Sequence, residues 1–104
     1  MINSKKALAT VRVKNNSNKY MDKLGFTYDG VGIQLFNLKN LGIKEIKEIE
    51  IPTEYFRDRT IIRMYTEDGR IYSIKEDVSK NENITIEISI NEIKEDGSLE
   101  FDIL

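Results

Sequence analysis

The sequence predicts an α+β domain made mainly of antiparallel β-hairpins, arranged as a curved sheet, a small sandwich or a partly open barrel, with one short helix. Three observations support this prediction: apolar and polar residues alternate over 84–90, Asp-Gly turn signals occur in two hairpin-like stretches, and residues 17–24 have helical spacing. With 104 residues, the chain forms one domain over 1–104 and can bury roughly 65% of its unfolded surface.

The C-terminal stretch predicts a hairpin with a defined register. Four isoleucines alternate with Thr85, Glu87 and Ser89, which is typical of a strand with one buried face. Residues 95–97 form a three-residue loop closed by a left-handed glycine. Uninterrupted pairing would then put Asn91 opposite Phe101, so we expect one bulge. The predicted pairs are Lys94 with Ser98, Ile93 with Leu99, Ile90 with Phe101 and Ile88 with Ile103, with Asn91 and Glu92 both opposite Glu100.

A second hairpin is predicted over residues 60–75. A three-residue loop at 67–69 collects the apolar side chains on one face, whereas a two-residue turn at Asp68 and Gly69 scatters them. The other face then carries Arg63, Tyr65, Ile71 and Ser73, and residues 76–83 form a polar connection. The predicted pairs are Thr66 with Arg70, Met64 with Tyr72 and Ile62 with Ile74.

The N-terminal half predicts a strand followed by the helix. Residues 7–14 alternate, with Ala7, Ala9, Val11 and Val13 on one face. Ser17 can cap a helix that runs to about Leu24, with Gly25 as its left-handed end and Phe26 packing back on Met21.

Residues 26–51 predict further strands. Two strands over 26–28 and 31–38 flank a turn at Asp29 and Gly30, and the second strand either is buried on both faces or has a bulge near Leu35. Residues 41–46 form a turn or short helix, and residues 47–51 a strand that ends at Pro52. Residues 52–59 form a loop with room for one helical turn capped by Thr53.

Several classes of chemistry are excluded by composition. The chain has no cysteine and no histidine, which rules out disulfides, thiol nucleophiles, zinc-cysteine sites and imidazole bases. Residues 77–82 lack the central glycine of a calcium loop, so no metal or cofactor is assigned. The sequence gives no pair of acids a special environment, because the candidate acids lie at predicted solvent-facing positions, and we therefore expect no enzymatic activity. These acids are Glu45, Glu48, Glu50, Glu87 and Glu100.

The charge is distributed unevenly along the chain. The formal net charge is -2, but residues 1–23 carry six bases against one acid, and residues 76–104 carry nine acids against two bases. One interpretation is a basic arm for nucleic acid and an acidic surface for a basic partner. The preferred one places the first strand beside the last sheet, so that these charges pair internally. No apolar run is long enough to span a membrane and no signal sequence is recognised, so a cytoplasmic location is expected.

Arginines and aromatic residues gather between residues 55 and 72. Four of the five arginines lie within residues 57–70, interleaved with Tyr55, Phe56, Tyr65 and Tyr72. Arginine binds phosphate bidentately and aromatic rings stack on bases, so this segment is a candidate anion or nucleic-acid site. The alternative is a surface in which the arginines pair with Glu54, Asp58, Glu67 and Asp68. The candidate binding residues are Arg57, Arg59, Arg63, Arg70 and Tyr65.

The functional prediction is a small non-enzymatic binding protein that acts by protein-protein contact. The specific case that we expect is a phage or mobile-element modulator or inhibitor of a host defence protein, because the chain is small and rich in residues with AT-rich codons. Free sheet edges are the expected contact sites unless lysines guard them, and Lys5, Lys6, Lys14 and Lys94 are the candidates for that role. The alternative function is nucleic-acid or nucleotide binding through the arginine-tyrosine segment.

Overall fold

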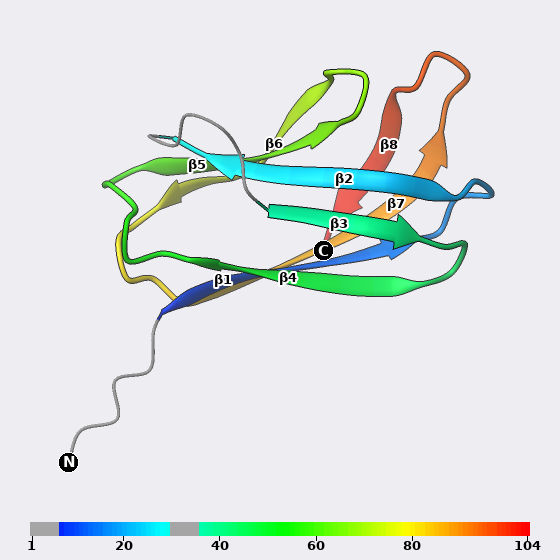
Figure 1. Ribbon diagram of the computed structural model, residues 1–104. Helices are drawn as coiled ribbons and strands as arrows, with labels where there is room; N and C mark the ends of the chain where they lie inside the picture. The colour runs from blue at the N-terminus through cyan, green and yellow to red at the C-terminus, as the bar shows by residue number, and fades with distance from the viewer. Residues whose placement is uncertain (1–6, 30–35) are drawn as a thin grey trace.

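The computed structural model describes residues 7–29 and 36–104 as a β-sandwich of two four-stranded sheets (Figure 1). Its strands are β1 (Leu8–Asn15), β2 (Met21–Tyr28), β3 (Phe36–Leu41), β4 (Ile46–Pro52), β5 (Thr60–Thr66), β6 (Ile71–Val78), β7 (Ile84–Ile93) and β8 (Leu99–Ile103). We call β4-β1-β7-β8 sheet 1 and β3-β2-β5-β6 sheet 2. Neighbouring strands are antiparallel except β1 and β7, which are parallel.

The predicted α+β class is wrong, because the described residues contain strands and no helix. The segment predicted as a helix ends in β2, which pairs with β3 on one side and β5 on the other. Leu24 and Phe26 point into the core, and Gly25 is an ordinary strand residue without positive φ. The apolar spacing of this segment fits both conformations, and its two strand partners decide between them. No helix in the described ranges is long and apolar enough to cross a bilayer.

The core lies between the two sheets and is filled by alternate residues of the strands. Ala9, Val11 and Val13 of β1 are fully buried, as the alternation over residues 7–14 predicts. Because β1 lies between β4 and β7, Arg12 contacts Glu48 of β4 at 2.9 Å and Glu87 of β7 at 3.1 Å. These contacts confirm, for Arg12, that the basic start of the chain pairs with acids inside the fold.

The C-terminal hairpin is confirmed in register. Ile93 pairs with Leu99, Ile90 with Phe101 and Ile88 with Ile103, and the register shifts between Ile90 and Glu92. Gly97 has φ of 91°, and the amide of Lys94 donates to the carbonyl of Ser98 at 2.8 Å. The predicted bulge and three-residue loop are therefore both present.

The second hairpin is confirmed only near its turn. Met64 pairs with Tyr72, but Ile62 pairs with Lys75 where Ile74 was predicted, and the register shifts twice along β5. Ile74 and Val78 are both buried while the three residues between them are exposed, so the strict alternation of buried and exposed residues is interrupted where the register shifts. The strand therefore continues to Val78, into the stretch predicted as a polar connection.

The remaining predictions have mixed outcomes. The strand predicted over residues 47–51 is confirmed as β4, and it follows a turn in which the amide of Glu45 donates to the carbonyl of Gly42. Residues 53–59 form turns without a helix, and the amide of Phe56 donates to the carbonyl of Thr53. The proposed bulge near Leu35 and the turn residue Gly30 lie outside the described residues.

A buried asparagine ties together two of the segments that cross between the sheets. Asn15, fully buried at the end of β1, donates from Nδ2 to the carbonyls of Lys19 at 2.8 Å and Leu41 at 3.1 Å. Its Oδ1 accepts from the amide of Ser17 at 3.0 Å and from the Ser17 hydroxyl at 2.6 Å. Ser17 therefore shapes the β1–β2 turn, and does not cap a helix as predicted.

Candidate functional site

The two lateral sides of the sandwich differ in how their edge strands are covered. On one side, which we call the closed side, the edges β3 and β4 lie against each other, and Lys47 Nζ donates to the carbonyl of Lys39 at 2.7 Å. On the other, the open side, the edges are β6 and β8, which start at neighbouring turns and diverge (Figure 1). The open side therefore presents two strand edges without a neighbouring strand in the described part of the chain.

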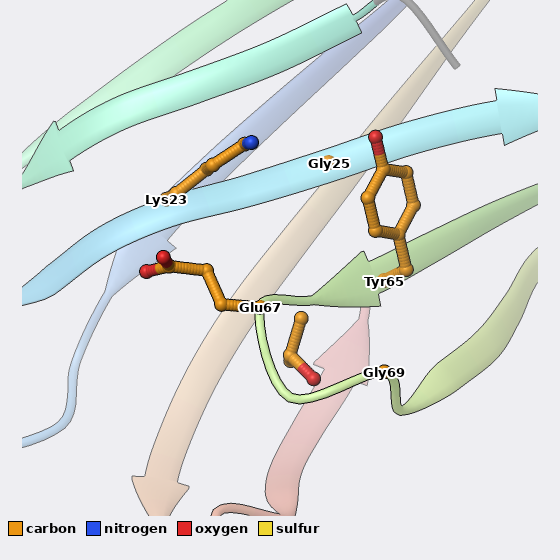
Figure 2. A pocket seen from close by; sticks show the side chains of 6 residues that line it. Lys23, Gly25, Tyr65, Glu67 and Gly69 are labelled. Atoms are coloured by element: carbon orange, nitrogen blue, oxygen red, sulfur yellow. The ribbon is translucent and has the colours of Figure 1, made fainter. Parts of the chain in front are cut away.

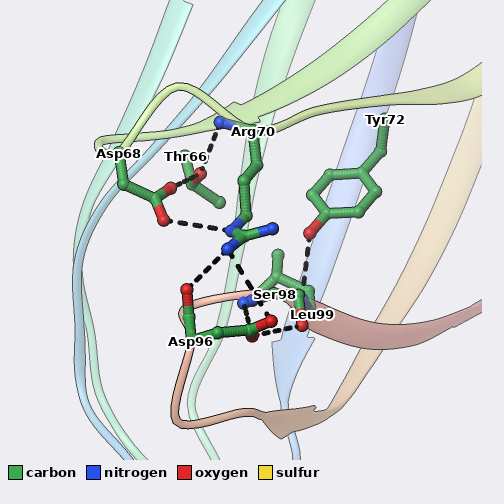
Figure 3. Close-up of polar contacts among 7 residues, drawn as sticks. All are labelled: Thr66, Asp68, Arg70, Tyr72, Asp96, Ser98 and Leu99. Atoms are coloured by element: carbon green, nitrogen blue, oxygen red, sulfur yellow. Dashed lines mark hydrogen bonds and ion pairs between the residues drawn. The ribbon is translucent and has the colours of Figure 1, made fainter.

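Arg70 joins the two turns at the start of the open side (Figure 3). Its Nε lies 3.1 Å from Asp68 Oδ2, and its Nη2 donates to the carbonyl of Asp96 at 2.6 Å. A hydrogen bond from the Thr66 hydroxyl is the main cause that lowers the pKa of Asp68, and hydrogen bonds from Ser98 lower the pKa of Asp96. Both carboxylates therefore stay ionised at neutral pH and hold the arginine between the hairpins.

Tyr72 makes the second link between β6 and β8 (Figure 3). Its hydroxyl accepts the amide of Leu99 at 3.0 Å, and its ring meets Phe101 edge-on with 5.3 Å between ring centroids. The amide of Leu99 thus points away from β7 and toward the open side. Since amide direction alternates along a strand, the amides of Phe101 and Ile103 also point away from β7.

Exposed apolar side chains occur on both edge strands of the open side, with Ile71 on β6 opposite Tyr65 and Ile103 and Leu104 at the end of β8. Ile71 is 64% exposed, Ile103 46% and Leu104 79%. On the outer face of sheet 1, Glu100 lies opposite Glu92, and Lys94 Nζ contacts Glu100 Oε1 at 3.1 Å. The hydrogen bond and the charge of Glu100 raise the pKa of Lys94, and Glu92 and Asp96 raise it further. The surface beside the edge of β8 therefore carries an excess of negative charge.

The five predicted binding residues do not form one cluster. Arg57 and Arg59 are exposed in the loop before β5, and Arg70 follows β5. Seven strand residues separate these positions by roughly 23 Å. Only Arg63 and Tyr65 share a face, the outer face of sheet 2. Arg63 Nη1 there binds Asp29 Oδ1 at 2.5 Å, and this hydrogen bond lowers the pKa of Asp29.

Tyr65 covers a glycine on the outer face of sheet 2 (Figure 2). It pairs with Gly25 across β2 and β5, and a Cβ added to Gly25 would lie 2.1 Å from Tyr65 Cζ. Beside this ring is a shallow hollow of about 340 Å³, lined by Lys23, Gly25, Tyr65, Thr66, Glu67 and Gly69. Burial raises the pKa of the Tyr65 phenol. A ring placed over a strand glycine stabilises the sheet, which is a structural role for Tyr65.

The buried polar side chains of the described residues are amides and hydroxyls. They are Asn15, Ser17, Thr53, Thr60, Thr66 and Ser89, none of which titrates near neutral pH. In residues 7–29 and 36–104, no three acidic side chains come together in a way that could hold a metal ion.

Sequence reasoning missed the roles of Tyr72, of the Arg70–Asp96 contact and of the β8 edge. The predicted register of the second hairpin places Tyr72 in the core, and nothing in its sequence context indicates that its hydroxyl binds a strand amide. Lys14, expected to guard an edge, lies on the interior strand β1.

Comparisons with known proteins add no relative: no family model matches the chain, and neither the curated proteins nor the solved structures include a match.

Proposed function

We propose that this chain is a non-enzymatic binding protein that contacts a protein partner through its open side. The observation that carries the proposal is the edge of β8, where the outward amides of Phe101 and Ile103 have no neighbouring strand among the described residues and lie beside the exposed apolar side chains of Ile103 and Leu104. Partner proteins use such edges by adding a strand, because the main chain supplies hydrogen bonds and alternate side chains supply specificity.

Other surfaces of the described residues are less suited to a partner. The closed side covers its own edges, and on the outer face of sheet 1 Arg12 is held between Glu48 and Glu87. A standard interface covers about 800 Å² per partner. The whole chain exposes 6544 Å², so one such contact would occupy roughly an eighth of its surface. Covering a partner's surface in this way is how a small inhibitor or modulator acts, and we include that mode of action in the proposal.

Capture from cell extract, with paired surface variants, tests this function. The tagged chain is incubated with extract in the presence and absence of nuclease, and bound proteins are identified by mass spectrometry. The open-side variant carries Ile71→Glu and Leu104→Glu. The matched control carries Ile43→Glu and Ile46→Glu, which change two side chains of similar exposure, 52% and 54%, next to the closed side. All four side chains are exposed, so both variants should fold.

The proposal expects a stoichiometric protein partner that survives nuclease, is lost with the open-side variant and is kept with the control. Equal capture by both variants would exclude the open side as the contact surface. Nucleic acid recovered alone, and released by salt, would instead favour the nucleic-acid function and direct attention to Arg63 and Tyr65 on the outer face of sheet 2.

A further inference from the structure

We infer that the free edge of β8 binds an extended partner strand in which lysine or arginine alternates with apolar residues. This inference rests on the proposed function and specifies the chemistry of the partner. It follows from three features of β8: an edge that no described strand covers beyond the Leu99 amide bound by Tyr72, an apolar inner face and an acidic outer face.

The edge of β8 lacks the protective features of the other three edges in the described part of the chain. β6 has two register shifts beside it and carries Lys75. β4 ends at Pro52 and sends Lys47 across to β3, and β3 itself contains Asn40 with φ of 58°. Bulges, lysine, proline and backbone irregularity all discourage strand addition. Leu99–Ile103 contains neither lysine nor proline, and its only register shift lies on the partner strand β7.

The inner face of β8 favours apolar residues in the partner strand. Phe101 and Ile103 pair with the buried residues Ile90 and Ile88, so they point to the interior between the sheets. Ile103 is nevertheless 46% exposed, because no strand follows β8 in sheet 1. An added strand would cover this exposed surface with every second side chain.

The outer face of β8 favours basic residues in the partner strand. Glu100 and Asp102 point outward on either side of Phe101, and Glu92 lies opposite Glu100. Asp102 accepts a neutral hydrogen bond from Asn91 Nδ2 at 2.9 Å, and Lys94 is the one cation that contacts Glu100 in the described residues. Opposite charges placed across a strand pair stabilise a sheet, and like charges destabilise it.

The same acids argue against a second copy of this chain as the occupant. In an antiparallel pair of β8 strands centred on Phe101, Glu100 of each copy would face Asp102 of the other. Centring the pair on Glu100 or Asp102 would place that acid opposite itself. These three registers, which overlap the two strands most fully, all set acids against acids, and this favours a basic partner strand over self-association.

A synthetic peptide supplies the probe. Fluorescein-labelled Lys-Val-Lys-Val-Lys-Val-Lys is titrated with the full chain and followed by anisotropy at low and high salt. Two control peptides separate charge from pattern: Glu-Val-Glu-Val-Glu-Val-Glu, and a peptide with the same lysines and valines in separate blocks. The alternating basic peptide should bind at least about tenfold more tightly than either control, and salt should weaken its binding.

Two further tests distinguish strand addition from simple charge attraction. Ile103→Pro removes an outward amide that the β7–β8 ladder does not use, whereas Ile103→Ala keeps that amide and shortens the side chain. The proline variant should lose binding and the alanine variant should retain most of it. Should the proline variant fail to fold, peptides N-methylated on alternate residues answer the same question: methylation of one set of amides should abolish binding, and methylation of the other set should not.

Equal binding of the acidic and basic peptides, or equal effects of both N-methylation patterns, would overturn the inference. So would the absence of binding by the basic peptide at millimolar concentration. These results leave the proposed function to its own test: a partner captured through the open side, together with no basic-peptide binding, would retain the function and reject this strand chemistry. Failure of both experiments would reject both.

Discussion

The closed and open sides of the sandwich are held together by different kinds of interaction. Near the closed side, Asn15 is fully buried and its amide group forms neutral hydrogen bonds to both crossing segments. On the open side, Arg70 joins two turns through the Asp68 carboxylate and the Asp96 carbonyl, with a side chain that is 38% exposed. Buried hydrogen bonds are costly to break, whereas exposed ion pairs contribute little. Strong interactions therefore stabilise the fold on the side where its edge strands are covered, and weak interactions join the sheets on the side where an edge is free.

The largest effect should follow from removing the Asn15 amide. Asn15→Leu keeps a side chain of similar volume but removes the hydrogen bonds from Asn15 to the Leu41 carbonyl and the Ser17 amide, and leaves the Lys19 carbonyl with only the Ser17 hydroxyl among its side-chain donors. We expect the free energy of unfolding in urea to fall by about 3 kcal/mol. Asn16→Ala is the control, since Asn16 is only half-buried and its side chain donates one hydrogen bond, to Ser89. Similar losses of unfolding free energy for the two variants would show that the buried hydrogen bonds of Asn15 contribute no more than a half-buried one.

A smaller effect is expected from the hydroxyl of Tyr72. Tyr72→Phe keeps the ring against Phe101 and removes the acceptor of the Leu99 amide. The free energy of unfolding should fall by about 1 kcal/mol, and the Leu99 amide should exchange with solvent faster. Tyr55→Phe removes a hydroxyl from a side chain that is 71% exposed and should change neither quantity. Unchanged exchange at Leu99 in Tyr72→Phe would show that this link does not hold β8.

Arg70→Gln should weaken the open side less than Tyr72→Phe does. The substitution removes the ion pairs with Asp68 and Asp96, but all three side chains are substantially exposed. Arg59→Gln removes an exposed arginine away from these turns and serves as the control. High salt should reduce the difference between Arg70→Gln and the wild type, because exposed ion pairs are screened. A loss of stability that exceeds that of Asn15→Leu would contradict the comparison.

The C-terminal hairpin was predictable because its pattern admits only one register. The apolar side chains of residues 84–103 reach a common face only with a bulge at Asn91 and Glu92, so the local pattern determines the register. The β5–β6 hairpin differs because Ile62 and Ile74 fit a regular register equally well. The register shifts leave the three charged residues between Ile74 and Val78 exposed, and no local apolar pattern indicates where these shifts occur.

The conformation of β2 and the place of the candidate site were not predictable, for a different reason. Gly25 reads as a helix end, and its actual partner is Tyr65, forty positions along the chain. The clustered arginines are similarly separated because Arg57 and Arg70 lie beyond opposite ends of β5. Which strand ends a sheet depends on the strand order, and that order follows from long-range pairing such as the parallel contact of β1 with β7.

The smallest expected effect is the pH dependence of the open-side contact. The pKa values of Asp68 and Asp96 are lowered in the folded chain, mainly by hydrogen bonds from Thr66 and Ser98, with a further contribution from Arg70. A lowered folded-state pKa stabilises the fold above the unfolded-state value near 3.8, and this stabilisation is lost as the pH falls through the folded-state value. The stability difference between the wild type and Arg70→Gln should therefore be constant from pH 7 to about pH 5 and shrink below about pH 4. Urea unfolding of both proteins between pH 2 and pH 7 measures it. A difference that stays constant down to pH 2 would mean that Arg70 stabilises the turns through the Asp96 carbonyl and not through the two carboxylates.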